Sequence, residues 1–478
     1  MRFPASDPSR VIQAVFGPLE ILATPNARML KPFVATTLAS SEFLNSVQKC
    51  RHRRQICAKN AHRRRVSRCP SRELSAPPLT FDGVSAGDAE AVVAMADRYG
   101  LDAMTAATLQ RYGFDPVTFD LLRCRVGDRA HDGDASAADN RVRGNIEPPN
   151  SDDLVALPPP DSAERGQFTD AGREAIALGR VGVLLLAGGM ATRFGGGVKA
   201  LAEVLDGLTF VDVKLADLRR LARELDCSIP LTLMTSFQSD DALASWAETA
   251  ALSTGSGEPR RVPVGLAPQG VSMRLRADGE LFRDDTSGAV SLHAPGHGEA
   301  PWAMRRAGIL DQFAADGGRH IFVTNVDNAT ATLDPAVIGA HLVHERPLSC
   351  EVVAGEASGG APWRVDGHLQ ILESFRLPSG VDPTAAGAVN TNSLVVDVEV
   401  FAAQWPLTWF EVRKRVGPDE VVQFERLIGE LSAFADTTML LVDRDGPDGR
   451  FQPVKDPAEL AARRREIADI LTARGVIS

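Results

Sequence analysis

The pattern of hydrophobic and polar positions changes along the chain, and from about residue 180 onward short apolar blocks alternate with amphipathic ones. Short apolar blocks predict buried strands, whereas apolar residues at helical spacing predict helices. The predicted elements are, in order, strand 181–186, helix 210–225, strand 230–234, helix 239–249, strand 319–324 and helix 335–345. This alternation predicts an α/β fold with a doubly wound, mixed but mostly parallel sheet, whose ligands lie beyond the carboxyl ends of the strands.

Further helical patterns flank this region. Before it, residues 88–100 and 115–126 predict two helices, and a short helix is expected at 170–178. A stretch at 127–160 that is rich in Asp, Gly, Asn and Pro predicts a linker. After it, residues 457–474 predict a charged amphipathic helix.

A chain of 478 residues, 44% of them hydrophobic, allows two or three domains with a large core. No window approaches the ~20 apolar residues of a membrane span, and no signal-peptide pattern opens the chain. The six cysteines form no disulfide framework, and Cys50, Cys57 and Cys69 lack a C-x-x-C pair, which argues against zinc. We therefore expect a cytoplasmic protein with no membrane partner.

Charge divides the chain into a basic start and an acidic remainder. Residues 1–75 hold 14 Lys/Arg and 4 Asp/Glu, a net of +10, so the whole-chain charge of −10 leaves −20 for the rest. An acidic body argues against a nucleic-acid substrate. The basic cluster at 51–68 is open to RNA binding, to a targeting role, or to a disordered extension with a start codon assigned too far upstream. We favour the extension, because residues 1–75 carry none of the motifs described below.

The most informative segment is a glycine-rich turn that follows the strand predicted at 181–186. It carries Gly188, Gly189, Gly195, Gly196 and Gly197 together with Thr192, Arg193 and Lys199. Backbone N–H groups and cations gathered after a strand suit a phosphate or pyrophosphate. A Walker A loop is excluded because Ala200 follows Lys199, and the pattern G-x-G-x-x-G does not fit these glycines. Taken alone, the segment is either another kind of phosphate-binding loop or a tight turn.

Eight segments form an ordered set of motifs. They are LAGG…TRFG…K (186–199), LMTSFQSDDA (233–242), APQG (267–270), APGHGE (294–299), FVTNVDNATATLD (322–334), AVNTNSLVV (388–396), VVQFERLIG (421–429) and RFQPVK (450–455). In this order they resemble the motifs of the UTP–sugar-1-phosphate uridylyltransferases, the family of eukaryotic-type UDP-glucose pyrophosphorylases and UDP-N-acetylhexosamine pyrophosphorylases. The chain is therefore identified as a member of that family.

The resemblance implies the Rossmann-like fold of nucleotide-diphospho-sugar transferases. Together with the charge and composition described above, it divides the chain into a basic, disordered extension (1–75), a helical segment and linker (76–160), a catalytic domain (161–445) and a C-terminal segment with a lysine and a helix (446–478). Family members of the eukaryotic type often continue into a left-handed β-helix that mediates assembly. We expect no such domain in this sequence, and the oligomeric state is left open.

The resemblance also implies uridylyl transfer, in which the phosphate oxygen of glucose 1-phosphate attacks the α-phosphorus of UTP and pyrophosphate leaves. The nucleotide-binding candidates are Leu186, Ala187, Gly188, Gly189, Lys199, Gln269, Gly296, Asp327 and Lys455. Arg193, Lys199 and Lys455 are the catalytic candidates, the first two facing the β- and γ-phosphates and the third the α-phosphate. Asp327 is the candidate ligand of Mg²⁺. Without the resemblance, Asp327 is an ordinary turn or cap residue and Lys455 a surface residue.

Base and sugar contacts are implied in the same way. Gln269 and Gly296 are assigned to uracil, because a glutamine amide both donates and accepts, as the imide edge requires. The sugar-phosphate candidates, beside Gly188, Gly189 and Asp327, are His297, Asn325, Glu373, Asn390 and Asn392. The spacing of His293 and His297 is that of a zinc helix, but the proline and glycines between and after them exclude a helix.

The chain departs from the family pattern at Ala191, Val198, Glu299, Thr330 and Ser393. Ala191 replaces a glycine at a position where positive φ is plausible. The PGHG motif favours glucose, whereas LLLAGG and TRFG resemble the N-acetylhexosamine branch, which is the alternative. A catalytically silent regulator that binds nucleotide sugars is a third hypothesis, and the four retained charged candidates at 193, 199, 327 and 455 argue against it.

Overall fold

The computed structural model describes residues 93–94, 96–131, 140–252, 261–285, 287–356 and 359–477. The extension predicted at 1–75, and most of the helix predicted at 88–100, lie outside these residues. None of the helices in the described ranges is long and apolar enough to span a membrane.

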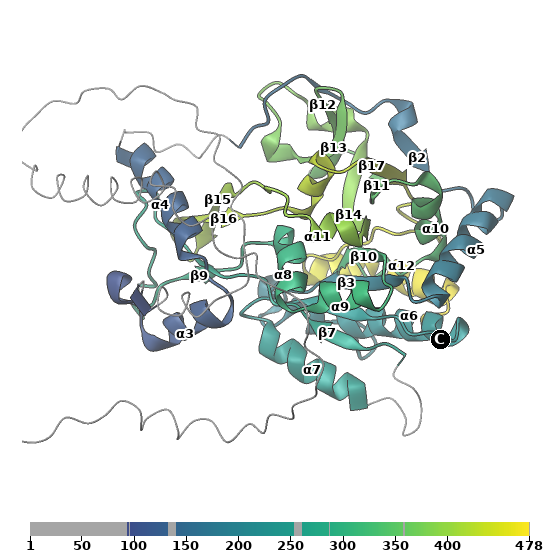
Figure 1. Cartoon of the computed structure of the whole chain (residues 1–478), viewed down its shortest axis with the longest axis horizontal. Coiled ribbons are helices and arrows are strands. Elements are labelled where there is room, and N and C mark those ends of the chain that lie inside the picture. The colour runs from purple at the N-terminus through teal and green to yellow at the C-terminus, as the bar shows by residue number, and fades with distance from the viewer. Residues whose placement is uncertain are drawn as a thin grey trace, which may run out of the picture. The chain divides into compact units, whose positions relative to one another are not determined.

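An eight-stranded sheet forms the centre of the described residues (Figure 1). From edge to edge it consists of β2 (Leu154–Ala156), β17 (Thr437–Leu441), β11 (Leu348–Ala354), β14 (Ala388–Asp397), β10 (His320–Asn325), β3 (Val181–Leu186), β6 (Leu231–Met234) and β7 (Val264–Leu266). All of these strands share one direction except β14, which is antiparallel to both of its neighbours. The predicted mixed, mostly parallel sheet is confirmed.

Smaller elements surround this sheet. The other strands are β1 (Ile146–Glu147), β12 (Gly360–Val365) and β13 (His368–Glu373) in one sheet, and the pairs β4 (Glu203–Leu205) with β5 (Leu208–Thr209), β8 (Ser272–Met273) with β9 (Leu292–His293) and β15 (Phe410–Val416) with β16 (Asp419–Glu425). The helices are α3 (Ala103–Arg111), α4 (Pro116–His131), α5 (Ala163–Ala177), α6 (Phe210–Glu224), α7 (Asp240–Leu252), α8 (Ala300–Arg306), α9 (Ile309–Ala315), α10 (Pro335–His344), α11 (Val398–Ala402) and α12 (Pro457–Ala473).

Both faces of the central sheet are buried, which explains the continuous apolar runs of its strands. Along β3, Val183 and Leu185 face a core that includes residues of α5, α6, α10 and α12. Leu184 and Leu186 face the opposite core, which includes residues of α8, α9 and α11. The sheet is therefore the middle layer between two layers of helices.

Helix α5 is longer than the helix predicted at 170–178, because Ser162 caps its N-terminus by accepting a hydrogen bond from the Arg165 N–H. Glycines allow α5 and α10 to pack closely, side by side (Figure 1). A Cβ atom at Gly172 would lie 1.8 Å from the carbonyl oxygen of Pro335, and one at Gly339 would lie 1.8 Å from that of Phe168. Gly172 thus interrupts the apolar pattern of α5, and together with Gly339 it allows the close packing of α5 against α10.

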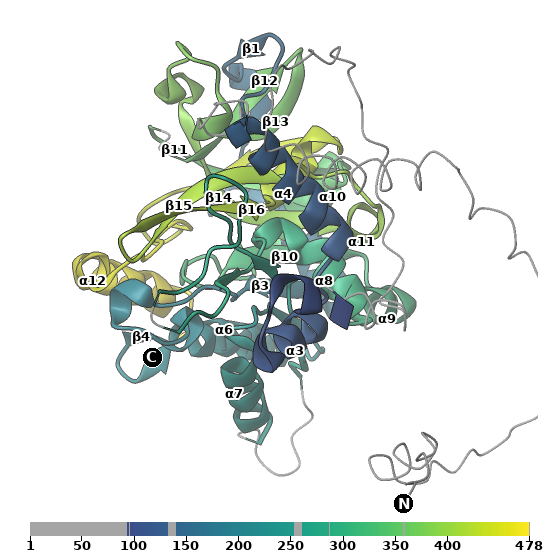
Figure 2. The same ribbon diagram turned by 90° about the vertical axis from the view of Figure 1, so that its left-hand side faces the viewer.

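The stretch predicted as a linker at 127–160 contributes to structure. Helix α4 continues to His131, and β2 forms the edge strand of the central sheet beside β17. The three-residue length and partial exposure of β2 leave no alternating pattern to find in the sequence. Helices α3 and α4 pack against β8 and β16 through a third apolar cluster, and Figure 2 shows them on the side that bears β15 and β16.

Candidate active site

The glycine-rich loop after β3 folds back on itself through backbone hydrogen bonds. The N–H of Lys199 donates to the carbonyl of Gly189 (3.1 Å), and that of Ala191 donates to Gly197 (2.8 Å). Ala191 has φ −85°, so alanine is accommodated without strain. The glycines at 195–197 take positive φ instead, with values of 87°, 108° and 81°. The substitution at 191 therefore leaves the loop geometry intact.

A compact cluster lies where this loop meets the APQG and APGHGE segments. The Gln269 side chain is 3% exposed, and its Oε1 accepts a hydrogen bond from the N–H of Gly296 (3.0 Å). A Cβ atom at Gly188 would lie 2.3 Å from Gln269 Nε2, so a side chain there would displace the Gln269 amide. Leu186 and Ala187 are buried, which leaves their backbone alone for a ligand. The structure thus brings the predicted nucleotide-contact residues together.

The charged candidates converge at the carboxyl ends of β3 and β10, which are adjacent parallel strands. Lys199 and Asp327 form an ion pair, and their side chains are 16% and 20% exposed. The N–H of Val454 donates to the carbonyl of Asp327 (3.2 Å), so Lys455 follows the residue bonded to that aspartate. Arg193 is exposed, and within the described part of the chain its side chain has no hydrogen bond or ion pair. Lys199 and Asp327 therefore lie together, and the backbone next to Lys455 is bonded to the same aspartate.

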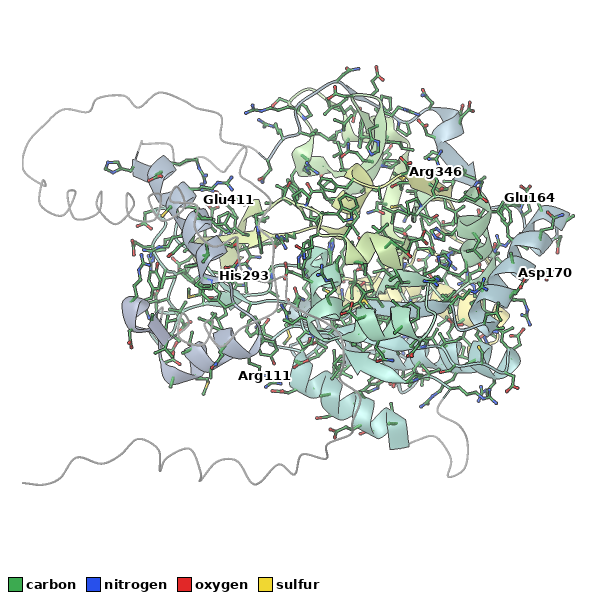
Figure 3. The ribbon with its side chains drawn as sticks, in the orientation of Figure 1. Arg111, Glu164, Asp170, His293, Arg346 and Glu411 are labelled. Carbon is green, nitrogen blue, oxygen red and sulfur yellow. The ribbon has the colours of Figure 1, made fainter. Side chains whose placement is uncertain are left out.

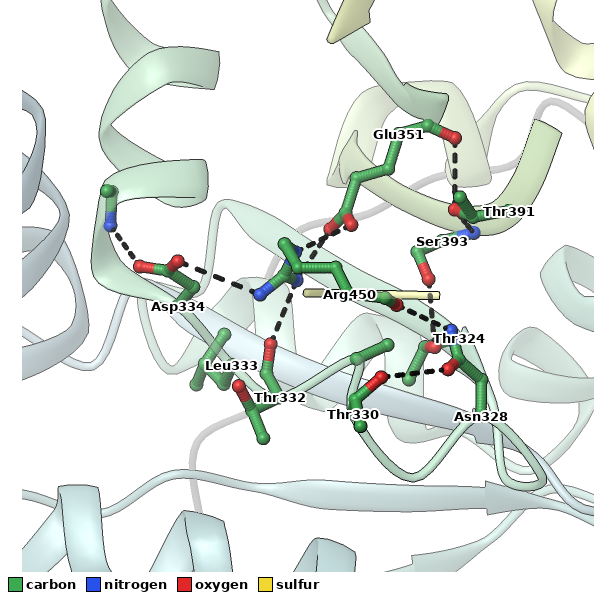
Figure 4. A network of polar contacts seen from close by, with 12 residues as sticks. Thr324, Asn328, Thr330, Thr332, Leu333, Asp334, Glu351, Thr391, Ser393 and Arg450 are labelled. Carbon is green, nitrogen blue, oxygen red and sulfur yellow. Dashed lines mark hydrogen bonds and ion pairs between the residues drawn. The ribbon is translucent and has the colours of Figure 1, made fainter. Parts of the chain in front are cut away.

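A buried network holds the Asp327 turn against the C-terminal segment (Figure 4). The guanidinium of Arg450 bonds both carboxylate oxygens of Glu351, each at 2.7 Å, and Arg450 is 1% exposed. Asn328 donates from Nδ2 to the Arg450 carbonyl (2.9 Å), and its Oδ1 accepts from the N–H of Gln452 (3.0 Å). Bidentate pairing fixes the arginine rigidly, so the network fixes the position of residues 450–455 relative to Asp327.

Lys214 of α6 also holds the turn that follows Asp327. Its Nζ donates to the carbonyls of Asn328 (2.6 Å) and Ala331 (2.5 Å). Burial lowers the pKa of Lys214 to about 7. Nearby, the buried carboxylate of Asp217 accepts a hydrogen bond from the N–H of Leu333 (3.0 Å). These two residues were missed from the sequence, although a lysine and an aspartate within the apolar stripe of an amphipathic helix are a detectable signal.

The amide and carboxylate candidates gather around the start of β14. Because β14 is antiparallel, its first residues meet the end of β10, and Asn392 Nδ2 donates to Asn325 Oδ1 (3.0 Å). Asn392 has φ +59° and its N–H donates to Asn390 Oδ1 (3.2 Å). A Cβ atom at Gly360 would lie 2.7 Å from Glu373 Oε1 and 3.3 Å from Asn390 Nδ2. Burial raises the pKa of Glu373. The four predicted sugar contacts thus form one polar group.

The protonation of His297 follows from its hydrogen bond. Its Nδ1 accepts from the N–H of Ile428 (3.0 Å), and burial lowers its pKa to about 4. The ring is therefore neutral at pH 7 and carries its proton on Nε2, which makes Nε2 a donor. His293 lies on β9 (Figure 3) and His297 in a 3₁₀ turn, so no zinc helix contains them, as predicted.

A divalent cation at this site would be bound by the carboxylate of Asp327. A single carboxylate at a strand end suits Mg²⁺, which takes most of its ligands from phosphates and water. Within the described ranges, its carboxylate is paired with Lys199 rather than with a second acidic side chain. The donor set fits a cation bound jointly with a substrate.

Comparison with known proteins gives the same family as the sequence motifs. The family model described as UTP–glucose-1-phosphate uridylyltransferase matches residues 139–473, which is more than half of the chain. The chain belongs to this family.

Individual relatives within the family are distant. The enzymes named UTP–glucose-1-phosphate uridylyltransferase from Hordeum vulgare and Solanum tuberosum are 28% and 29% identical over 305 and 304 residues. Each match covers 59% of this chain and 61% of the relative, so the chain spans about three-fifths of the length of these curated relatives.

Solved structures share the fold. A mutant UDP-glucose pyrophosphorylase from Leishmania major in complex with UDP-glucose matches with a TM-score of 0.57 at 23% identity, covering 79% of each chain. A putative UDP-N-acetylglucosamine pyrophosphorylase from Entamoeba histolytica matches with a TM-score of 0.57 at 16% identity, covering 66% of this chain and 84% of that one. At these identities the likeness concerns the fold alone.

Proposed function

We propose that this chain is a UTP–glucose-1-phosphate uridylyltransferase that forms UDP-glucose and pyrophosphate. The observation that carries the proposal is the convergence of Lys199, Asp327 and the segment ending in Lys455 beside the Gln269–Gly296 cluster. These groups come from five separate parts of the sequence. Cations and a carboxylate suit the phosphates of a nucleoside triphosphate, and the neighbouring polar groups of Gln269 and Gly296 suit its base.

In this proposal the nucleotide lies over the loop at 186–189, with uracil against Gln269 and Gly296. The neutral His297 donates from Nε2 to the phosphate of the sugar phosphate, which orients the attacking oxygen. The polar group of Asn325, Glu373, Asn390 and Asn392 binds the sugar hydroxyls. Catalysis then rests on alignment and charge, without a covalent enzyme intermediate.

The leaving pyrophosphate gains negative charge as the bond breaks between the α-phosphorus and the oxygen that bridges the α- and β-phosphates. Lys199 and Arg193 offset that charge, and Lys455 stabilises the α-phosphate. When bound at Asp327, Mg²⁺ neutralises phosphate charge and aligns the phosphates. An exposed Arg193 is consistent with a side chain that turns inward only when phosphates are present.

The division of the chain is part of the proposal. Residues 161–445 carry the base, metal and sugar groups, and residues 446–478 supply Lys455. Residues 1–75 take no part in the reaction, and residues 76–160 support the catalytic domain. As part of the same proposal, we place the protein in the cytoplasm.

Pyrophosphate release by the purified chain tests the proposal, with UTP and either glucose 1-phosphate or N-acetylglucosamine 1-phosphate. We expect release with glucose 1-phosphate, dependent on Mg²⁺ and abolished by EDTA. Faster release with the amino sugar would instead place the chain in the N-acetylhexosamine branch. No release with either sugar, while UTP still binds, would favour the silent regulator.

A further inference from the structure

A second cluster of ligand-type side chains lies at the other end of β10, away from the proposed active site. It consists of His320, His341 and Asp397, whose ligand atoms all lie within 4.8 Å of one another. His320 Nδ1 lies 2.6 Å and His341 Nε2 lies 3.0 Å from the same oxygen, Asp397 Oδ1. His320 begins β10 and Asn325 ends it, so the two sites are separated by about 16 Å of strand at ~3.3 Å per residue.

Three different elements position these side chains. His320 and Asp397 are partners across the β10–β14 pair, and His341 comes from α10, which covers the sheet. The Nδ1 of His341 is 2.8 Å from Ser349 Oγ on β11, which orients the ring with Nε2 toward the aspartate. His341 is 2% exposed, whereas the side chains of His320 and Asp397 are 15% and 28% exposed. The cluster is therefore held rigidly and open to solvent on one side.

We propose that His320, His341 and Asp397 bind a divalent transition-metal ion such as Zn²⁺, with water in the fourth position. Two imidazole nitrogens and one carboxylate oxygen are a common zinc donor set, whereas Mg²⁺ prefers oxygen ligands alone. The metal would bind His320 Nδ1 and His341 Nε2 without their protons, so the ring proton of each histidine would lie on its other nitrogen, and that on His341 Nδ1 would donate to Ser349 Oγ.

The metal would join β10, β14 and α10 at the edge opposite the active site. A metal that binds only the folded chain stabilises it in proportion to the logarithm of its concentration over its Kd. The occupancy of the site is thus measurable as a change in stability, without reference to turnover.

Zinc content of the full-length chain tests this proposal, measured by mass spectrometry after dialysis against zinc buffered at roughly micromolar free concentration. We expect the wild type to bind one zinc per chain more than His320→Gln, and we expect Asp327→Asn to retain that zinc. His344→Gln is the matched control, because His344 lies on the same helix outside the cluster. Cysteines before residue 75 are common to all of these chains and cancel in the comparison.

Two further measurements separate a metal site from a hydrogen-bonded triad. Ser349→Ala is expected to weaken zinc binding about 10- to 100-fold, as for other groups that orient a metal-bound histidine. Cobalt(II) added to the wild type is expected to give the visible absorption of a four-coordinate site, absent in His320→Gln. Equal zinc content in the wild type and His320→Gln, both folded by circular dichroism, would overturn the proposal. In that event the three side chains form a hydrogen-bonded network alone.

Discussion

At the scale of single residues, the role assigned to Lys455 can be separated from folding. Its side chain is exposed, and the segment before it is held by the bond between the Val454 N–H and the Asp327 carbonyl. Lys455→Ala removes the ammonium group and leaves that bond in place. We expect kcat to fall by about 10²–10³, the effect of losing one transition-state charge contact, while the Kd for UTP changes by less than about tenfold. Steady-state kinetics and calorimetry measure the two quantities.

Arg465→Ala supplies the control for this variant. Arg465 lies on α12 with a side chain that is 95% exposed, and it has one weak ion pair, with Asp469 at 3.8 Å. Its loss is expected to leave both kcat and the Kd for UTP unchanged. Equal changes in kcat and Kd for Lys455→Ala, or no change in either, would show that the assigned role is wrong.

His293 gives a pH dependence of stability. Burial, followed by the charge of Arg274, lowers its pKa from 6.5 to about 3. Because the folded state binds the proton less well than the unfolded chain, the stabilisation is complete above pH 6.5 and is lost as the pH falls toward 3. Each pH unit in this window corresponds to about 1.4 kcal/mol.

His293→Asn tests this dependence, since an asparagine amide still donates a hydrogen bond to the Ala294 carbonyl without titrating. Urea unfolding at pH 7 and pH 5 gives the change in the free energy of unfolding for both chains. The wild type is expected to lose about 2 kcal/mol more than the variant between these pH values. An equal loss would mean that the folded chain binds a proton at His293 as well as the unfolded chain does.

At the scale of elements, α5 offers two glycines in contrasting surroundings. A Cβ atom at Gly172 would meet the backbone of Pro335 at 1.8 Å, whereas one at Gly166 meets nothing within 4 Å. Gly172→Ala should therefore separate α5 from α10 and lower the free energy of unfolding by about 2 kcal/mol or more. Gly166→Ala should raise it by about 0.5–1 kcal/mol through helix propensity. Chemical denaturation of both variants checks the pair, and a common sign would contradict the packing argument.

Elements buried on both faces were predictable, and those defined by long-range contacts were not. Strand 181–186 agrees with β3, and strand 319–324 differs from β10 by one residue, because parallel strands in a covered sheet are continuously apolar. The sequence predicts a linker where β2 lies, because the place of β2 depends on pairing with β17, which lies almost 300 residues away.

The same distinction holds in the candidate site. Motifs indicated which residue types meet a nucleotide, and Asp327 was placed at a strand end from its position alone. The sequence could not show that Lys199 pairs with Asp327, or that Val454 bonds to the same residue, because these contacts depend on the β3–β10 pairing and on the Arg450–Glu351 network. The residue types of the site can thus be predicted from local motifs, whereas the positions of these residues relative to one another depend on the fold.

At the scale of the whole molecule, the apolar cluster shared by α3, α4, β8 and β16 determines where the chain can be shortened. Leu109 and Phe119 are at most 2% exposed, and they pack in one cluster with Met273, Val422 and Phe424. Arg123 adds a buried hydrogen bond from Nε to the carbonyl of Gly279 (2.7 Å). Removal of α3 and α4 would expose this apolar surface on the rest of the catalytic unit.

Two truncations therefore have different expected outcomes. The described residues all belong to one compact unit, so a chain that starts at residue 77 should keep the melting temperature and the turnover of the full-length protein. A chain that starts at residue 140 uncovers the α3–α4 cluster and should melt at least several degrees lower or aggregate. Differential scanning calorimetry measures both. Equal melting temperatures for the two truncations would show that α3 and α4 contribute little to the core, whereas a loss already at residue 77 would show that the basic extension stabilises the catalytic unit.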